Sequence, residues 1–172
     1  AAPGAKSFTA AEALENTGKV LSFDLYPQRV KLIEDGAKRL SITNLTAKVG
    51  DASKVDESLF GVADRVLCDV PCSGLGTIRR KPEIRYKDLS FIDKLTDLQY
   101  NILTNASSYL RADGQLVYST CTLNRAENEA VCDRFLENHP EFEKTDDYNT
   151  LMPHKNGTDG FFIARLRRKH GN

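Results

Sequence analysis

The stretch "KVLSFDLYPQRVKLIEDGAKRL", residues 19–40, decides the fold class. It opens with a short apolar run that ends on Asp24, as a buried strand does. Pro27 follows at the first turn of a helix, where its missing N–H has no partner to lose. The next apolar residues recur at helical spacing: Val30, Ile33, Ala37 and Leu40. The stretch therefore predicts one strand followed by one amphipathic helix, the repeating unit of α/β sheets.

The same alternation continues along the chain. Further strands are predicted at residues 45–51, 63–70, 114–120 and 160–166. Further helices are predicted at residues 7–15, 95–109 and 124–139, and a long loop at 153–160. Gly114 is expected to terminate the second of these helices, and Asn124 with Glu127 resembles a capping box at the start of the third. Strands that alternate with helices favour a mostly parallel, doubly wound α/β sheet.

The composition limits the class of protein. A chain of 172 residues suits one domain, residues 1–172, that can bury a core without disulfides or metal. Its 24 basic and 24 acidic side chains cancel, so only a local patch would attract a polyanion. No stretch resembles a signal peptide or a membrane span, and we expect a cytoplasmic protein with free thiols and no membrane contact.

The first residues, "AAPGAKS" (1–7), form a loop that opens a helix. Such loops normally follow a strand, which aims the loop at its ligand. That strand would precede residue 1, so we expect an N-terminally truncated domain whose first strand is missing. A phosphate-binding loop of nucleotide hydrolases needs glycine directly before Lys6, where Ala5 stands, and this alternative is disfavoured.

Three acids end three consecutive predicted strands: Asp24, Asp51 and Asp69. Ligands of doubly wound sheets bind outside the carboxyl ends of the strands. Asp24 follows Gly4 by about 20 residues, the separation at which an acid holds the hydroxyls of a ribose. The pattern predicts a site for a nucleoside-bearing cofactor.

Two of the four cysteines follow strands directly. Cys72 stands in "DVPCSG" and Cys121 in "YSTCTL". A thiol in such a place becomes a nucleophile when its pKa is lowered or a base activates it. Cys68 lies inside a strand and Cys132 beside the apolar stripe of a helix, and both are interpreted as small core side chains. The spacing lacks the paired short knuckles of zinc sites, so no metal is expected.

Four stretches together resemble the Sun-type family of RNA cytosine-5 methyltransferases. They are "AAPGAK" (1–6), "DVPCSGLGTIRRKPEIRY" (69–86), "LVYSTCTLNRAENE" (116–129) and "DGFFIARLRR" (159–168), in this order. The resemblance covers nearly the whole chain and implies a class I, Rossmann-like methyltransferase that uses S-adenosylmethionine. It also implies upstream RNA-binding domains that are absent here. The family normally has a second glycine where Ala5 stands.

The resemblance implies a role for each site residue. Around the methionine part of S-adenosylmethionine it places Ala1, Ala2, Pro3, Gly4, Ala5 and Lys6. It gives Asp24 the ribose hydroxyls, Asp51 the adenine, and Asp69 both the charged end of the cofactor and the target base. It makes Cys121 the nucleophile and Cys72 the thiol that assists product release.

The implied chemistry needs both thiols. A thiolate adds to carbon 6 of cytosine because carbon 5 alone is too weak a nucleophile to take a methyl group. A hydrogen bond from Asp69 at ring nitrogen 3 would ease that addition. Release then requires loss of the carbon 5 proton and expulsion of Cys121. DNA cytosine-5 methyltransferases instead take their nucleophile from a Pro-Cys motif, and on that alternative Cys72 attacks.

One segment carries the features of an RNA contact, combining positive charge with an aromatic ring. Its residues are Arg79, Arg80, Lys81, Arg85 and Tyr86. We expect a monomer that methylates small-subunit (16S-type) ribosomal RNA. Three alternatives stay open: a tRNA cytosine as target, a non-catalytic module that binds RNA or cofactor, and a thiol redox or acyl-transfer protein. The lack of a C-x-x-C pair counts against the redox alternative.

Overall fold

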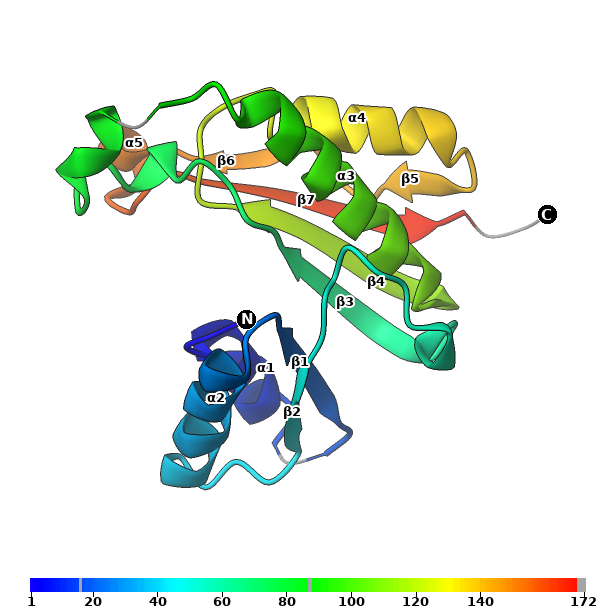
Figure 1. Cartoon of the computed structure of the whole chain (residues 1–172). Helices are drawn as coiled ribbons and strands as arrows, with labels where there is room; N and C mark the ends of the chain where they lie inside the picture. The colour runs from blue at the N-terminus through cyan, green and yellow to red at the C-terminus, as the bar shows by residue number, and fades with distance from the viewer. Residues whose placement is uncertain (16, 87, 170–172) are drawn as a thin grey trace. The chain divides into compact units, whose positions relative to one another are not determined.

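A computed structural model of the protein describes residues 1–15, 17–86 and 88–169. The chain divides into two compact units, Ala1–Lys54 and Val55–Asn172. Each unit has a sheet of its own (Figure 1).

The first unit alternates helices and strands. Its elements are α1 (Ala5–Ala13), β1 (Val20–Asp24), α2 (Pro27–Arg39) and β2 (Leu45–Val49). Helix α2 begins at Pro27, as predicted, and buries Val30 and Ile33. Strands β1 and β2 run parallel, with Asp24 opposite Val49, so both carboxyl ends lie at one edge of the sheet.

The second unit is built on a mixed sheet. Its strands are β3 (Ala63–Asp69), β4 (Leu110–Thr120), β5 (Phe142–Lys144), β6 (Asn149–Leu151) and β7 (Phe161–Arg168). The order is β3-β4-β7-β5, with β6 also paired to β7. Strands β3 and β4 run parallel, whereas β7 runs antiparallel to its neighbours. Asp69 pairs with Ser119, so the loops that follow β3 and β4 leave the sheet at the same edge.

Two long helices, α3 (Ile92–Ser108) and α4 (Glu129–Asn138), lie side by side on this sheet (Figure 1). Shorter helices are η1 (Glu57–Leu59), η2 (Leu75–Thr77), η3 (Pro82–Tyr86) and α5 (Pro153–Asn156). The core between helices and sheet contains the fully buried side chains of Leu103, Leu116, Tyr118, Phe135 and Phe162. The strand ends are therefore fixed to a packed layer.

Several predicted boundaries differ from the structure. Gly114 lies inside β4 and does not terminate α3. Helix α3 ends at Ser108, and Tyr109 is its C-cap with a right-handed helical backbone conformation. The buried Leu110 is already the first residue of β4. Helix α4 begins at Glu129 with Asn128 as its N-cap, because residues 125–128 form a turn. Residues 153–160, predicted as a loop, include the short helix α5.

Candidate active site

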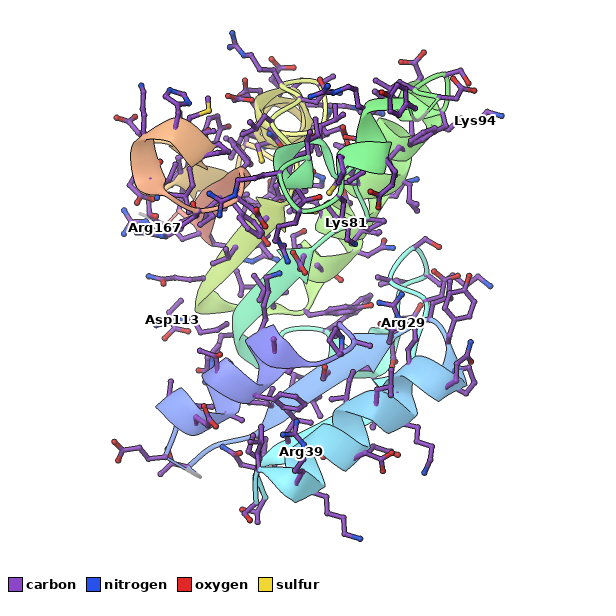
Figure 2. The ribbon with its side chains drawn as sticks, turned by 90° about the vertical axis from the view of Figure 1, so that its left-hand side faces the viewer. Arg29, Arg39, Lys81, Lys94, Asp113 and Arg167 are labelled. Atoms are coloured by element: carbon purple, nitrogen blue, oxygen red, sulfur yellow. The ribbon has the colours of Figure 1, made fainter. Side chains whose placement is uncertain are left out.

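In the first unit, the N-terminal loop meets the end of β1 at Asp24. The Asp24 side chain is nearly buried, and its Oδ2 accepts hydrogen bonds from the Ala1 amino group at 2.7 Å and from the Ala2 N–H at 2.9 Å. The Nε of Arg29, which Figure 2 labels on α2, is 3.1 Å from Oδ1. Burial raises the pKa of Asp24, but these hydrogen bonds outweigh it and leave the pKa at about 2. The carboxylate is therefore anionic at neutral pH.

Gly4 shapes the turn from this loop into α1. Its φ is 109°, in the left-handed region, and a Cβ there would lie 2.5 Å from the Phe8 ring. Glycine is thus required by both backbone and packing. Pro3 precedes it, while Ala5 and Lys6 form the first turn of α1, where N–H groups lack intrahelical partners.

Asp51 lies beyond the end of β2, close to the end of β1. The Gly50 N–H donates to the Asp24 carbonyl oxygen at 3.0 Å, which ties the two strand ends together. The Asp51 carboxylate accepts hydrogen bonds from Ser53 Oγ at 2.6 Å and Ser53 N–H at 3.0 Å. These bonds lower the pKa of Asp51. The structure therefore gathers the predicted loop and the first two acids at one edge of the first unit.

This edge fits a nucleoside-bearing cofactor. An anionic carboxylate at the carboxyl end of a parallel strand, as Asp24 is, can accept hydrogen bonds from a pair of ribose hydroxyls. A glycine that no side chain can replace, as at Gly4, is typical of loops that let a ligand approach the backbone.

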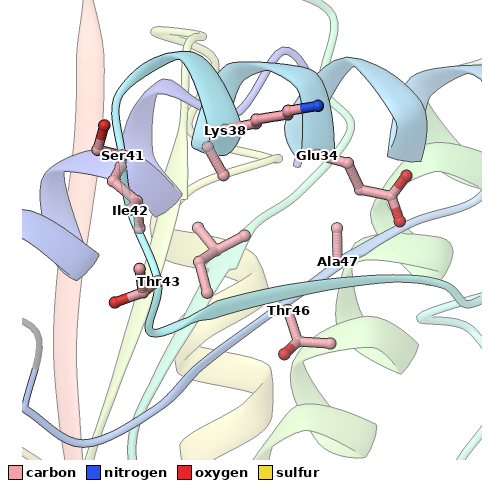
Figure 3. Close-up of a pocket in the computed structure, with 9 residues that line it drawn as sticks. Glu34, Lys38, Ser41, Ile42, Thr43, Thr46 and Ala47 are labelled. Atoms are coloured by element: carbon pink, nitrogen blue, oxygen red, sulfur yellow. The ribbon is translucent and has the colours of Figure 1, made fainter.

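A hollow of about 630 Å³ lies elsewhere in the first unit, between the end of α2 and the start of β2 (Figure 3). Its lining is Glu34, Ala37, Lys38, Ser41, Ile42, Thr43, Leu45, Thr46 and Ala47. It contains none of the predicted site residues. Leu45 pairs with Val20 at the opposite end of the strands from Asp24, so this hollow is separate from the acidic edge.

In the second unit, the structure brings Cys72 and Cys121 together. Their Sγ atoms are 3.2 Å apart, neither cysteine forms a disulfide, and both are partly exposed. Each follows a strand of the parallel pair, β3 or β4, which explains how residues 49 positions apart meet. The hydrogen bond to Cys121 and then burial raise the pKa of Cys72 well above its usual range. Either Sγ can be the donor of the hydrogen bond that joins the two thiols.

The other two cysteines are core side chains, as their sequence positions predict. Cys68 and Cys132 are buried in the apolar core of the second unit. Burial is the main cause that raises the pKa of both thiols, to about 12 for Cys68. Neither has the environment of a reactive cysteine.

Asp69 ends β3 beside the thiols' edge of the sheet. Ser119 Oγ, on the neighbouring strand, donates to Asp69 Oδ1 at 3.1 Å. Asp69 is exposed as a residue, at the end of the strand that leads to Cys72.

Glu127, whose spacing from Asn124 predicts a capping box, is instead a buried residue of the thiol site. It is fully buried, and its Oε2 accepts from the Ser73 N–H at 2.7 Å and from Gln99 Nε2 at 3.1 Å. Its Oε1 accepts from Ser73 Oγ at 2.5 Å and from Asn124 Nδ2 at 3.2 Å. The capping-box spacing to Asn124 does produce one of these contacts, but the other partners lie far away in sequence.

The helix η2 packs directly on the Cys121 loop. The Gly76 N–H donates to the Cys121 carbonyl oxygen at 3.0 Å, and the Gly160 N–H donates to the Gly76 carbonyl oxygen at 2.8 Å. A Cβ at Gly76 would lie 2.1 Å from the Gly160 carbonyl oxygen, so only glycine fits. The Arg80 guanidinium forms an ion pair with the buried Asp159 next to this contact.

The predicted RNA segment is mostly exposed. The Tyr86 side chain stands 86% exposed, and Arg79, Lys81 (labelled in Figure 2) and Arg85 are exposed around it. Arg80 differs from its neighbours, because the Asp159 ion pair engages its guanidinium.

Two negative findings hold for the described part of the chain. Residues 1–15, 17–86 and 88–169 contain no group of three or more His, Cys, Asp and Glu arranged to hold a metal ion. Within the same ranges, every helix is too short or too polar to cross a membrane.

Comparison with known sequences gives consistent matches over the chain. A family model described as 16S rRNA methyltransferase RsmB/F matches residues 1–167. The chain is 41% identical to the probable ribosomal RNA small subunit methyltransferase B of Bacillus subtilis (strain 168), covering 98% of this chain and 42% of that protein. It is 32% identical to the ribosomal RNA small subunit methyltransferase F of Aeromonas salmonicida (strain A449), covering 99% and 39%. The chain thus spans about two fifths of these relatives.

Solved structures confirm the α/β, Rossmann-like methyltransferase fold. NSun6 from Pyrococcus horikoshii, solved with SFG, aligns with a TM-score of 0.86 at 31% identity and covers 99% of this chain and 47% of that one. A SAM-dependent methyltransferase from Aquifex aeolicus aligns with a TM-score of 0.63 at 10% identity, over 95% of this chain and 76% of that one, and shows the fold alone.

Proposed function

Because the chain belongs to the RsmB/F family of 16S rRNA methyltransferases, we propose that it transfers a methyl group to carbon 5 of a cytosine in small-subunit ribosomal RNA. The observation that carries this proposal is the 3.2 Å pair of Cys72 and Cys121 at neighbouring strand ends. Cytosine-5 chemistry needs one sulfur to attack and a second group to end the reaction. The names of the relatives support ribosomal RNA over tRNA as the substrate.

The acidic edge of the first unit would hold S-adenosylmethionine. Asp24 would accept hydrogen bonds from the ribose hydroxyls, Asp51 would lie by the adenine, and residues 1–6 would contact the methionine part. The charge and burial of Asp24 support its part. When bound, S-adenosylmethionine supplies the methyl group as an electrophilic sulfonium.

Cys121 would act as the nucleophile. Its thiolate adds to carbon 6, a carbon–sulfur bond forms, and the C5=C6 π electrons move toward carbon 4 and nitrogen 3. Asp69, exposed at the end of β3, would in its protonated form donate a hydrogen bond or a proton to nitrogen 3 and stabilise that shift. Carbon 5 becomes electron-rich enough to be methylated. The resemblance of residues 116–129 to the Sun-type family supports this assignment over the Pro-Cys alternative.

Cys72 would end the reaction. Its hydrogen bond to Cys121 is the largest cause of its raised pKa, and that cause weakens once the Cys121 sulfur is bonded to carbon 6. Cys72 then gives its thiol proton to solvent, and the resulting thiolate, or a water that it orders, takes the carbon 5 proton. The C5–H electron pair restores the C5=C6 double bond, the C6–S bond breaks, and Cys121 leaves as a thiolate.

The exposed segment with Arg79, Lys81, Arg85 and Tyr86 would contact RNA through phosphate charges and base stacking. Arg80 would contribute less, because Asp159 holds its guanidinium. We place this activity in the cytoplasm, in a monomer that needs no metal.

The test is transfer of a labelled methyl group. The intact protein is incubated with 16S-type ribosomal RNA or with tRNA and labelled S-adenosylmethionine, and the RNA is digested to nucleosides. We expect labelled 5-methylcytidine from ribosomal RNA only. Label in tRNA alone would change the substrate, and cofactor binding without any labelled cytidine would favour the non-catalytic module.

A further inference from the structure

The turn that carries Cys72 is anchored on both sides. Before the cysteine, the Pro71 carbonyl oxygen accepts from Gln99 Nε2 at 2.8 Å. After it, the Ser73 N–H and Oγ both donate to the Glu127 carboxylate, at 2.7 and 2.5 Å. Gln99 itself donates to Glu127 at 3.1 Å, so one carboxylate completes both anchors.

The turn that carries Cys121 is anchored by Asn128, the residue that follows Glu127 in the chain. Thr120 Oγ1 donates to Asn128 Oδ1 at 2.6 Å, and Asn128 Nδ2 donates to the Thr122 carbonyl oxygen at 3.0 Å. All three of these residues are buried. The side-chain amide of Asn128 therefore holds the residues on both sides of Cys121.

These two anchors are consecutive residues on one rigid segment. The buried Tyr118 hydroxyl donates to the Glu127 carbonyl oxygen at 2.6 Å, which fixes the backbone just before α4. The Ser73 and Thr122 hydroxyls also hydrogen-bond each other at 2.8 Å. The segment Glu127–Asn128 thus couples the two turns that carry the thiols.

We propose that Glu127 is a positioning residue for the release step: its carboxylate holds the Cys72 turn at the separation from Cys121 that lets Cys72 take the carbon 5 proton. The inference rests on the proposed function. Every hydrogen-bond partner described above meets the carboxylate as a donor, and an ionised carboxylate is an acceptor on both oxygens. An amide in its place would turn an NH₂ group toward these donors.

The first experiment compares Glu127→Gln with Glu137→Gln, an exposed glutamate on the same helix α4. With ribosomal RNA and cofactor, we expect Glu127→Gln to turn over about 100-fold more slowly, because a displacement near 1 Å costs about that much. We also expect its covalent RNA adduct to accumulate while the KM for RNA stays unchanged. Glu137→Gln should behave as wild type. A folded Glu127→Gln protein in which adduct and turnover fall together would overturn the proposal.

The second experiment does not depend on methylation. Phenylarsine oxide bridges two adjacent thiols: two As–S bonds replace the As=O bond, and the two thiol protons leave with the oxygen as water. Mass spectrometry of the intact protein and of the linked peptides gives the bridging rate. We expect Cys72 and Cys121 to be bridged in wild type. In Glu127→Gln the bridging rate should be about tenfold lower, because the variant loses about the equivalent of one hydrogen bond to a charged group.

The outcomes separate the two proposals. Wild-type bridging and no adduct in Glu127→Gln would refute the role of Glu127. If Glu127→Gln slows bridging but the wild-type protein methylates no RNA, the positioning role of Glu127 stands and the proposed function is rejected. If Glu127→Gln does not fold, Ser73→Ala decides, since it keeps the Ser73 N–H bond to Glu127 but removes the hydroxyl's bonds to Glu127 and Thr122, and it should slow bridging in the same direction.

Discussion

The strand ends of the two units hold their functional groups in different ways. In the first unit, Asp51 takes its hydrogen bonds from Ser53, two residues along the chain, and Asp24 from the loop at residues 1–2. In the second unit, the loops after β3 and β4 present thiols, and Glu127, which holds the Cys72 turn, lies 54 residues from Ser73. The first arrangement needs only a loop and a strand, whereas the second needs a packed core.

This difference matches what each edge would do. Donors around Asp24 keep it ionised, with a pKa of about 2, as a binding carboxylate must be. The buried network around Glu127 and Asn128 ties both thiol-bearing turns to one segment and so holds the separation of the two reacting sulfurs. The first edge is therefore suited to binding and the second to bond making.

The largest expected effect is the loss of the nucleophile. Cys121→Ala should lower the single-turnover rate of methyl transfer by more than about 10⁴-fold, since the group that forms the covalent bond is gone. Binding of S-adenosylmethionine, measured by equilibrium dialysis, should not change, because Asp24 and the loop are intact. A variant that keeps a tenth of the wild-type rate would show that the thiol edge does not make the bond.

A smaller effect is expected where η2 meets the thiol loop. Gly76→Ala places a Cβ 2.1 Å from the Gly160 carbonyl oxygen, so backbone must move. We expect the free energy of unfolding to fall by about 2–3 kcal/mol, as for other overpacked sites. Urea denaturation measures it. A change below about 0.5 kcal/mol, the range of neutral surface substitutions, would contradict the close approach.

Asp24→Asn tests the binding edge. Removing the charge should weaken S-adenosylmethionine binding by about 2 kcal/mol, the size of a hydrogen bond to a charged group. Asp35→Asn, an exposed carboxylate on α2, is the matched control and should bind as wild type does. Isothermal titration calorimetry of both variants checks this. Equal affinities of Asp24→Asn and wild type for S-adenosylmethionine would show that Asp24 does not bind the ribose.

The smallest effect is expected at the RNA segment. Tyr86→Ala should weaken RNA binding by about 1 kcal/mol through loss of one stacking platform. Tyr86→Phe keeps the ring and should retain the affinity. Stability should not change in either variant, because the side chain is 86% exposed. Filter binding at fixed salt measures the affinity, and equal weakening in both variants would exclude stacking.

The sequence predicts those parts of the fold that depend on local periodicity. Helix α2 starts at Pro27 as predicted, and β1, β2 and β3 lie within or at their predicted ranges. The meeting of Cys72 and Cys121 also follows from the sequence, because parallel strands end at one edge.

The remaining features depend on tertiary contacts. Strands β5 and β6 have three residues each, too few to show an alternating pattern, and exist because β7 pairs with them. Glu127 is spaced as a capping residue from Asn124, but its strongest partner, Ser73, approaches only once β3 and β4 have paired. Such a role cannot be obtained from spacing along the chain.

The most direct test of the division between the thiols is the covalent adduct with RNA. Cys72→Ala and Cys121→Ala proteins are each incubated with 16S-type ribosomal RNA and S-adenosylmethionine, and protein–RNA adducts are separated on a denaturing gel. The adduct should accumulate in Cys72→Ala, which can attack but not release, and be missing in Cys121→Ala. An adduct in Cys121→Ala and none in Cys72→Ala would make Cys72 the nucleophile and contradict the account.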